Sequence, residues 1–405
     1  MSRPIVLHEL DPDGRVVPLP TAVAEALSQT RLVEVRPEHH GRWRILPNGR
    51  VGAVRIDELQ VQVVPKRKVG LTKLLFLLGY ARDPGFRPED VAGVEEPDLW
   101  AALAESLARL AERATAGGVL QGYVTVDEAL RTVRGRIRIS DQIARRPGFM
   151  VPVEVTYDEF TVNITENRIL RTAIRRMLAV PRLSNSAAAR LAHLDGRLAE
   201  VSVLRHGEAL PAWRPTRLNE RYLPALRLAE LVLANTSAEA GDGTIRVAAF
   251  VVDMAKVFED FVGAALTEGL RRYPGTTRLQ YPDHLDEPGI GAKAAIPMYV
   301  DIVHTVNRLP RLVFDAKYKA EGPSGRYPNA DHYQMLAYCT ALQVPTAWLV
   351  YGGGGKPRVR TIRNTGVEVV EYPLDLRVEP GQLLAQVDRL AREAWGRSQR
   401  RESVA

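Results

Sequence analysis

The chain has 405 residues and a mass of 44.9 kDa, more than a single hydrophobic core usually organises, so two or three domains are expected. Hydrophobic residues make up 45% and charged residues 25%, which excludes a disordered or fibrous class, and we expect neither a signal peptide nor a membrane span. The net charge of +7 favours a polyanionic partner. The single cysteine, Cys339, excludes an intrachain disulfide. The expected location is the cytoplasm.

Residues 1–95 are expected to form a small β-rich domain. A short helix at Ala22–Leu27 precedes runs of β-branched and aromatic residues that are separated by turn signals. These predicted strands are Arg31–Val35, Trp43–Leu46, Val51–Ile56 and Gln60–Val64. Short strands without a helical rhythm between them are typical of a small barrel or sandwich. The basic cluster Lys66–Lys68 that follows is either a solvated strand end or a phosphate contact.

Residues 96–245 are expected to form a helical middle region with a β insertion. Apolar residues recur at helical spacing over Leu99–Arg113, Glu166–Ala179, Ala187–Leu198 and Tyr222–Leu233. In the insertion Arg134, Arg136 and Arg138 alternate with smaller residues, which would place three guanidinium groups on one strand face. That face either contacts DNA phosphates or faces solvent. The linker-like composition of 238–243 predicts a domain boundary near residue 245.

The carboxy-terminal part, residues 246–405, contains the pattern that points to chemistry. Tyr299–His304 and Arg311–Lys319 are strand-like runs joined by turn residues, which predicts a hairpin. If the chain folds back near Arg308, Asp301 comes to lie opposite the second strand. Asp315 and Lys317 share one strand face because side chains alternate. Two carboxylates and an ammonium group are therefore expected to converge at the open end of the hairpin.

Such a group suits the hydrolysis of a phosphodiester bond. Mg²⁺ takes oxygen ligands, commonly one or two carboxylates with water and phosphate, and it activates a bound water. We assign Asp301 and Asp315 as metal ligands, with Mn²⁺ as a substitute metal, and Lys317 as the residue that positions or activates the attacking water. The alternative is an ordinary hairpin whose charged side chains face solvent.

The flanking segments favour the catalytic interpretation. A helix capped by Asp253 carries Glu259 at the edge of its apolar stripe, and a helix over Asp331–Cys339 places Gln334 and Tyr338 on one face. With the last strand, Ala347–Tyr351, this order resembles the PD-(D/E)XK nuclease superfamily. The resemblance implies a mixed sheet flanked by helices, in an α+β or α/β multidomain chain. Glu259 is then a further acidic and metal-binding residue; a solvated helix carboxylate is its alternative.

Longer matches make the resemblance more specific. Val252–Val262, Asp315–Lys319 and Tyr333–Tyr338 are similar to the McrC family, the nuclease subunits of McrBC-type restriction systems, although Val300 stands where that family usually has proline. The resemblance implies an endonuclease for double-stranded DNA carrying 5-methylcytosine-type modifications. It also implies a hexameric AAA+ GTPase partner of the McrB type, which the amino-terminal part would dock on and stimulate.

Two further residues are assigned with the leading hypothesis. Gln334 would hold Lys317 or a DNA phosphate, and Lys319, like the three arginines of the insertion, is a candidate DNA contact. The glycine run before Lys356 lacks the spacing and the hydroxyl residue of a phosphate-binding loop, so this chain is expected to bind no nucleotide itself. Two other functions stay open: a non-catalytic adaptor that activates the motor, and a stand-alone RecB-like repair exonuclease.

Overall fold

The computed structural model describes residues 4–9, 11–65, 70–87, 98–205, 207–240, 246–286, 295–318 and 329–402. The chain divides into two compact units. Residues 1–99 and 249–405 form unit 1, and residues 100–248 form unit 2. Both units combine helices with sheets, and the expected mixed α and β class is confirmed.

The amino-terminal part of unit 1 is built on two sheets. Strands β1 (Ile5–His8), β6 (Leu59–Val64), β5 (Arg50–Ile56) and β11 (Arg246–Asp253) are neighbours in the first; β2 (Arg15–Pro18), β4 (Arg42–Pro47) and β3 (Val33–Pro37) form the second. Helix α1 (Thr21–Gln29) packs on β3 and β5, and a 3-10 turn spans His39–Gly41. Gly52 is required where β5 meets β11, since a Cβ there would lie 1.9 Å from the carbonyl oxygen of Phe250.

Aromatic contacts join this part to the carboxy-terminal half of unit 1. Helix α2 (Leu71–Arg82) packs along α8 (Met254–Leu270), where the ring centroids of Phe76 and Tyr80 lie 6.2 and 5.6 Å from that of Phe261. Helix α8 starts at the expected cap, because the Asp253 carboxylate accepts hydrogen bonds from the backbone N–H groups of residues 255 and 256.

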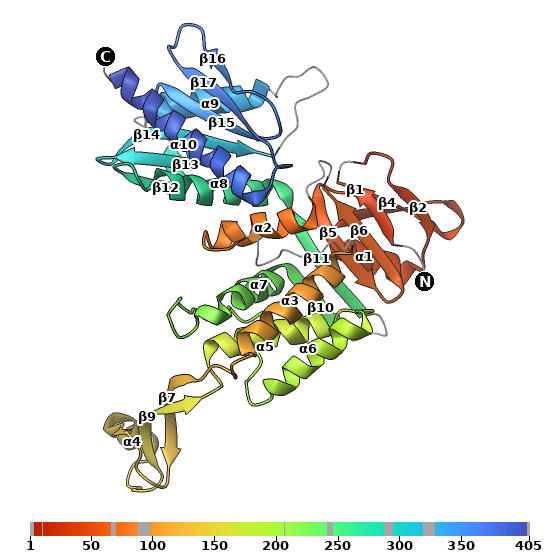
Figure 1. The fold of residues 1–405 in the computed structure, drawn as a ribbon, viewed down its shortest axis with the longest axis vertical. Coiled ribbons are helices and arrows are strands. Elements are labelled where there is room, and N and C mark those ends of the chain that lie inside the picture. Colours follow the sequence, from red (N-terminus) through yellow and green to blue (C-terminus); the bar gives the residue numbers. More distant parts are fainter. Residues whose placement is uncertain are drawn as a thin grey trace. The chain divides into compact units, whose positions relative to one another are not determined.

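A six-stranded mixed sheet dominates the carboxy-terminal half of unit 1 (Figure 1). Its order is β12 (Thr276–His284), β13 (Pro297–Val306), β14 (Leu309–Lys317), β15 (Thr346–Gly352), β17 (Glu368–Leu374) and β16 (Arg358–Thr361). Pairs β12–β13, β13–β14 and β16–β17 are antiparallel, whereas β14–β15 and β15–β17 are parallel.

Helices cover both faces of this sheet. Val313, Ala347 and Leu349 pack in one apolar cluster with residues of α9 (Asn329–Leu342). The side chains that alternate with them, including Phe314 and Trp348, point to the opposite face. Helix α8 and helix α10 (Pro380–Glu402) contact each other and the sheet. The core therefore has three layers, with the β13–β14 hairpin in the middle one.

Unit 2 is a helical bundle with a projecting ribbon. The bundle comprises α3 (Leu99–Thr115), α5 (Thr165–Leu178), α6 (Asn185–Arg197) and α7 (Leu223–Asn235), with a 3-10 turn at Glu220–Tyr222. Strands β7 (Gly122–Leu130) and β9 (Val153–Thr161) run out from the helices as an antiparallel pair (Figure 1). Strand β8 (Arg136–Ile137) and helix α4 (Ile139–Arg145) lie at its tip.

For this region the sequence predicted a linker that is too long and a strand that is too long. Within 238–243, which was expected to be linker, residues 238–240 belong to strand β10 (Thr236–Ala240). The strand expected around the three arginines is only Arg136–Ile137, because the chain enters α4 directly after Arg138. Lys66–Lys68 and Lys319 lie outside the described residues.

Candidate active site at the open end of the β13–β14 hairpin

The hairpin turn sets the register that brings the predicted residues together. Asn307 and Arg308 both have positive φ, 52° and 69°, as a tight two-residue turn between twisted strands requires. The resulting register places Ile302 opposite Phe314. Near the open end, the Oδ2 atom of Asp301 accepts a hydrogen bond from the backbone N–H of Ala316 at 3.1 Å. Asp301 therefore lies beside the Asp315–Lys317 segment, as the sequence predicted.

Asp315 is the most perturbed group at this site. Its side chain is fully buried, and burial raises its pKa to about 7, with a further contribution from the negative charge of Asp301. The Lys317 Nζ atom lies 2.6 Å from Oδ2, which offsets part of this shift. Apart from that ion contact, no donor among the described residues forms a hydrogen bond with either carboxylate oxygen. Asp315 thus has unused acceptor capacity in a buried position.

Lys317 stays charged at neutral pH. Burial acts to lower the pKa of its ammonium group, but Asp315 and Asp301 together raise it, and the net direction is upward. A lysine that holds its proton cannot take a proton from water. Its chemistry is therefore electrostatic: it can hold a water molecule or a phosphate oxygen and stabilise negative charge that develops beside it.

Glu259 reaches the same cluster from α8. Burial raises its pKa, and the nearby Asp301 carboxylate raises it further. The side-chain amide of Gln280, on β12, donates to Glu259 Oε1 at 2.5 Å and to Asp301 Oδ1 at 3.3 Å. The structure therefore unites Glu259, Asp301, Asp315 and Lys317. It also adds Gln280, which sequence reasoning missed.

Helix α9 contributes a second set of polar groups. The Gln334 amide donates to the Tyr338 hydroxyl at 2.6 Å, and that hydroxyl donates to the carbonyl oxygen of Tyr299 on β13 at 3.0 Å. Burial raises the pKa of Tyr338, and the charge of Asp315 adds to the shift. In this structure Gln334 therefore holds Tyr338, whereas the sequence-based expectation paired it with Lys317 or a phosphate.

The sequence model of the family described as "McrBC 5-methylcytosine restriction system component" matches residues 46–352. The chain belongs to the McrBC family. No curated protein matches the sequence.

Two solved structures from Thermococcus gammatolerans are similar to this McrBC-family chain. A chain of the "half-complex from tetradecameric assembly" of "McrB AAA+ hexamers with bound McrC" has a TM-score of 0.62 and 18% sequence identity, covering 96% of this chain and 99% of that chain. A chain of the cryo-EM McrBC complex has a TM-score of 0.43 and 20% identity, covering 67% of this chain and 90% of that chain. The first similarity extends the shared fold over nearly the whole length.

A fourth carboxylate lies near the cluster in this McrBC-family chain. Asp331, in the first turn of α9, is buried and accepts a hydrogen bond from the Tyr351 hydroxyl at 3.3 Å. Its charge helps to raise the pKa values of both Asp315 and Lys317. The sequence carried a signal for it, because Asp331 stands three residues before Gln334 and therefore on the same helix face.

The chemistry of the donor set fits a hard divalent cation completed by water and substrate. Within the described part of the chain, no three His, Cys, Asp or Glu side chains already form a closed metal-binding group. Mg²⁺ does not need one, since it keeps several waters and uses one or two carboxylates with substrate phosphates. The unsatisfied oxygens of buried Asp315, beside the Asp301 carboxylate, are what such an ion would neutralise.

The arginines of the ribbon do not form a uniform basic stripe. Arg134 stacks over the ring of Tyr157 at 4.3 Å, and Arg136 is exposed. Arg138 instead donates to Glu154 at 2.9 Å and also pairs with Asp141, so its charge is neutralised within the ribbon.

None of the helices among the described residues combines the length and apolar composition that crossing a bilayer requires.

Proposed function

We propose that this chain is the DNA-cleaving subunit of an McrBC-type restriction system and that it hydrolyses phosphodiester bonds with Mg²⁺. The observation that carries the proposal is Asp315, a fully buried carboxylate whose pKa is raised to about 7 and whose oxygens have unused acceptor capacity beside Asp301. A fold keeps such an unfavourable group where a ligand satisfies it, and perturbed carboxylates cluster at catalytic sites.

The order of the elements supports a PD-(D/E)XK nuclease core. Helix α8, strands β12, β13 and β14, helix α9 and strand β15 follow one another in the order expected of that superfamily. The parallel pairing of β14 with β15 places Leu349 opposite Asp315, so the carboxylate lies within the sheet that α9 covers. A site built on paired strands has the rigidity that catalytic positioning requires.

Each site residue has a role that follows from its surroundings. Asp301 and Asp315 would hold the metal ion, and Glu259 supplies a further carboxylate beside Asp301. When bound, the ion polarises the phosphoryl oxygen and activates water. The Lys317 ammonium orients the attacking water and stabilises the charge that develops on the phosphate. Gln334 and Tyr338 fix α9 against β13 through the carbonyl oxygen of Tyr299.

The proposed protein partner is a hexameric AAA+ motor of the McrB type, on which this chain would dock and whose nucleotide hydrolysis it would stimulate. The Thermococcus structure with the shared fold contains McrB AAA+ hexamers with bound McrC. The resemblance implied docking through the amino-terminal part, residues 1–95. We propose instead that the docking surface is the ribbon tip, which we define as residues 137–151. Phe149 and Met150 are 71% and 86% exposed there, and Ile139 and Ile143 are also exposed. Contiguous exposed apolar side chains mark protein-binding surfaces.

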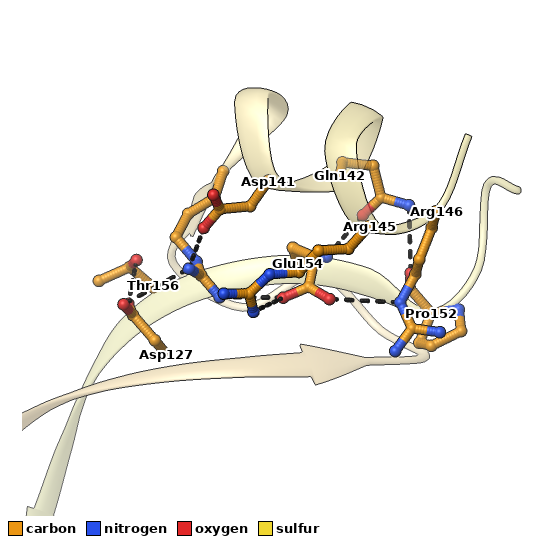
Figure 2. A network of polar contacts seen from close by, with 9 residues as sticks. Asp127, Asp141, Gln142, Arg145, Arg146, Pro152, Glu154 and Thr156 are labelled. Carbon is orange, nitrogen blue, oxygen red and sulfur yellow. Dashed lines mark hydrogen bonds and ion pairs between the residues drawn. The ribbon is translucent and has the colours of Figure 1, made fainter. Parts of the chain in front are cut away.

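A polar network keeps the ribbon tip folded without burying these apolar side chains. Figure 2 shows Glu154 of β9 beside Arg145 and Arg146. Its carboxylate pairs with Arg138 at 2.9 Å, Arg146 at 3.2 Å and Arg145 at 3.6 Å. Gln142 of α4 accepts from the Glu154 backbone N–H at 2.7 Å and donates to the carbonyl of Phe149 at 2.9 Å. Polar groups thus point inward and apolar groups outward, the arrangement expected of a surface that a partner covers.

The decisive experiment combines this chain with its motor on methylated and unmethylated DNA. Wild type should cut with Mg²⁺, while Lys317→Ala should stimulate motor hydrolysis fully and cut at least 100-fold more slowly. Lys73→Ala is the matched control, because Lys73 contacts Arg377 and Glu379 rather than the carboxylate cluster. Wild-type cleavage by Lys317→Ala would refute the assignment. Stimulation without cleavage by the wild type would indicate an adaptor, and end degradation without the motor a repair exonuclease.

A further inference from the structure

Gln280 has a backbone conformation that its side chain does not favour. In the pairing of β12 with β13, Leu279 lies opposite Ile302 and Tyr281 lies opposite Val300. Gln280, between them, is at φ +47°, in the left-handed region that residues other than glycine, asparagine and aspartate rarely adopt. Strained residues of this kind persist where the surrounding structure needs the side chain in one place.

The strained conformation accompanies a side chain that bridges two acidic groups. One Nε2 atom donates to Glu259 on α8 at 2.5 Å and to Asp301 on β13 at 3.3 Å. Glu259 and Asp301 repel each other when both are ionised. A neutral amide with two N–H bonds satisfies one oxygen of each carboxylate without adding charge. Glutamate at this position would add to the repulsion, and lysine would place a competing cation between the two.

Asp301 is thereby held through both of its oxygens. Oδ1 accepts from Gln280, while Oδ2 accepts from the backbone N–H of Ala316 on β14. Each oxygen retains further acceptor capacity, because a carboxylate oxygen has two lone pairs. The carboxylate is therefore fixed in orientation before any ligand arrives. Glu259, on a separate element, is tied to it by the same amide.

We propose that Gln280 is a positioning residue for the divalent-metal site, holding Glu259 and Asp301 at the spacing at which both face one ion. This inference rests on the proposed nuclease function and deepens it, since it assigns a role to a β12 residue that no motif includes. Residues that orient metal ligands typically change metal affinity by about 10- to 100-fold when they are removed. Gln280 should therefore act on metal binding more than on the chemical step.

The first test measures Mn²⁺ binding to the full chain by calorimetry, without DNA or motor. Gln280→Met keeps the length of the side chain and removes the donor, so its Mn²⁺ affinity should fall about 10- to 100-fold. Gln280→Gly relaxes the positive φ and also removes the donor. It should raise the melting temperature and still lose Mn²⁺ affinity. A glycine variant that binds Mn²⁺ like wild type would show that only the backbone conformation matters.

Gln343 provides a matched control for both substitutions. It is also a glutamine with positive φ, +54°, and it is exposed on the connection between α9 and β15. Gln343→Gly should raise the melting temperature as Gln280→Gly does, and neither Gln343→Gly nor Gln343→Met should change Mn²⁺ affinity. Equal losses of affinity at both positions would overturn the inference.

The second test measures cleavage by the chain with its motor. In Gln280→Met the Mg²⁺ concentration for half-maximal cleavage should rise about 10- to 100-fold, while the rate at saturating Mg²⁺ falls much less. Cleavage by wild type together with an unchanged Mg²⁺ requirement in Gln280→Met refutes the role of Gln280 alone. A wild-type chain that cuts no DNA refutes the proposed function instead. A wild-type chain that cuts DNA but binds no Mn²⁺ without it refutes the positioning role alone.

Discussion

Replacing Asp315 with asparagine should stabilise the fold and abolish cleavage. Burial, followed by the charge of Asp301, raises the Asp315 pKa from 3.8 to about 7 in the folded chain. A carboxyl with a raised folded pKa makes the folded state bind more protons than the unfolded state between these values. Stability is then fully present below about pH 4 and is lost as pH rises through about 7. Asparagine has no charge to bury and removes this loss.

The magnitude follows from the same two pKa values. A difference between 3.8 and about 7 corresponds to about 4 kcal/mol of lost stability at pH 8. Part of this gain is offset in Asp315→Asn, because Lys317 loses the carboxylate that lies 2.6 Å from its Nζ atom, while the charges of Asp301 and Asp331 still act on it. We expect a net gain of about 2 kcal/mol at pH 8, shrinking towards zero near pH 4.

The assay is urea denaturation of the metal-free chain at pH values from 4 to 8, with unfolding monitored by tryptophan fluorescence. Asp375→Asn is the matched control of opposite sign, since Arg377 hydrogen bonding lowers the pKa of that partly exposed carboxyl. It should destabilise the fold by less than about 1 kcal/mol; this effect is full above the unfolded pKa of 3.8 and declines as pH falls towards the lowered folded pKa. The reasoning is refuted if Asp315→Asn is less stable than wild type at pH 8, or if their stability difference does not change with pH.

Two further predictions concern the partner surface and the helix that carries Glu259. Substituting serine for both Phe149 and Met150, which are exposed, should leave the melting temperature unchanged and weaken motor binding at least 10-fold in a pull-down titration; unchanged binding would place the docking surface elsewhere. Asp253→Ala removes the cap of α8 and should lower the free energy of unfolding by about 1 kcal/mol, whereas Asp253→Asn should retain most of it. Equal stability of these two variants would contradict the capping role.

The sequence predicted the parts of the site that depend on local patterns. The β13–β14 hairpin was readable because turn residues lie between two strand-like runs, and the alternation of side chains placed Asp315 and Lys317 together. Helices α8 and α9 were readable from their spacing and, for α8, from the Asp253 cap. Each of these signals lies within one continuous stretch of the chain, either a single helix or two strands joined by a short turn.

The missed parts depend on pairing between distant segments. Strand β12 has mostly exposed or partly exposed side chains and no regular apolar alternation, so nothing in Thr276–His284 predicted it. The role of Gln280 exists only because β12 pairs with β13, 21 residues further on. The alternation of residues around Arg138 suggested a strand, but the chain enters α4 directly after this residue. The Arg138 side chain pairs with Glu154 of β9, a contact between distant residues that local alternation does not indicate.

The unfavourable features of this half of unit 1 coincide at one place. A buried carboxylate with unused acceptor capacity, a glutamine with positive φ and two adjacent acidic side chains from different elements all lie at the open end of one hairpin. Folding alone would be served better by asparagine at Asp315 and glycine at Gln280. Because local rules are broken where function requires it, the clustering argues for a bound cation more strongly than any one of these residues does. A structural role for Asp315 would need a set of donors around its oxygens, and the described residues provide only Lys317.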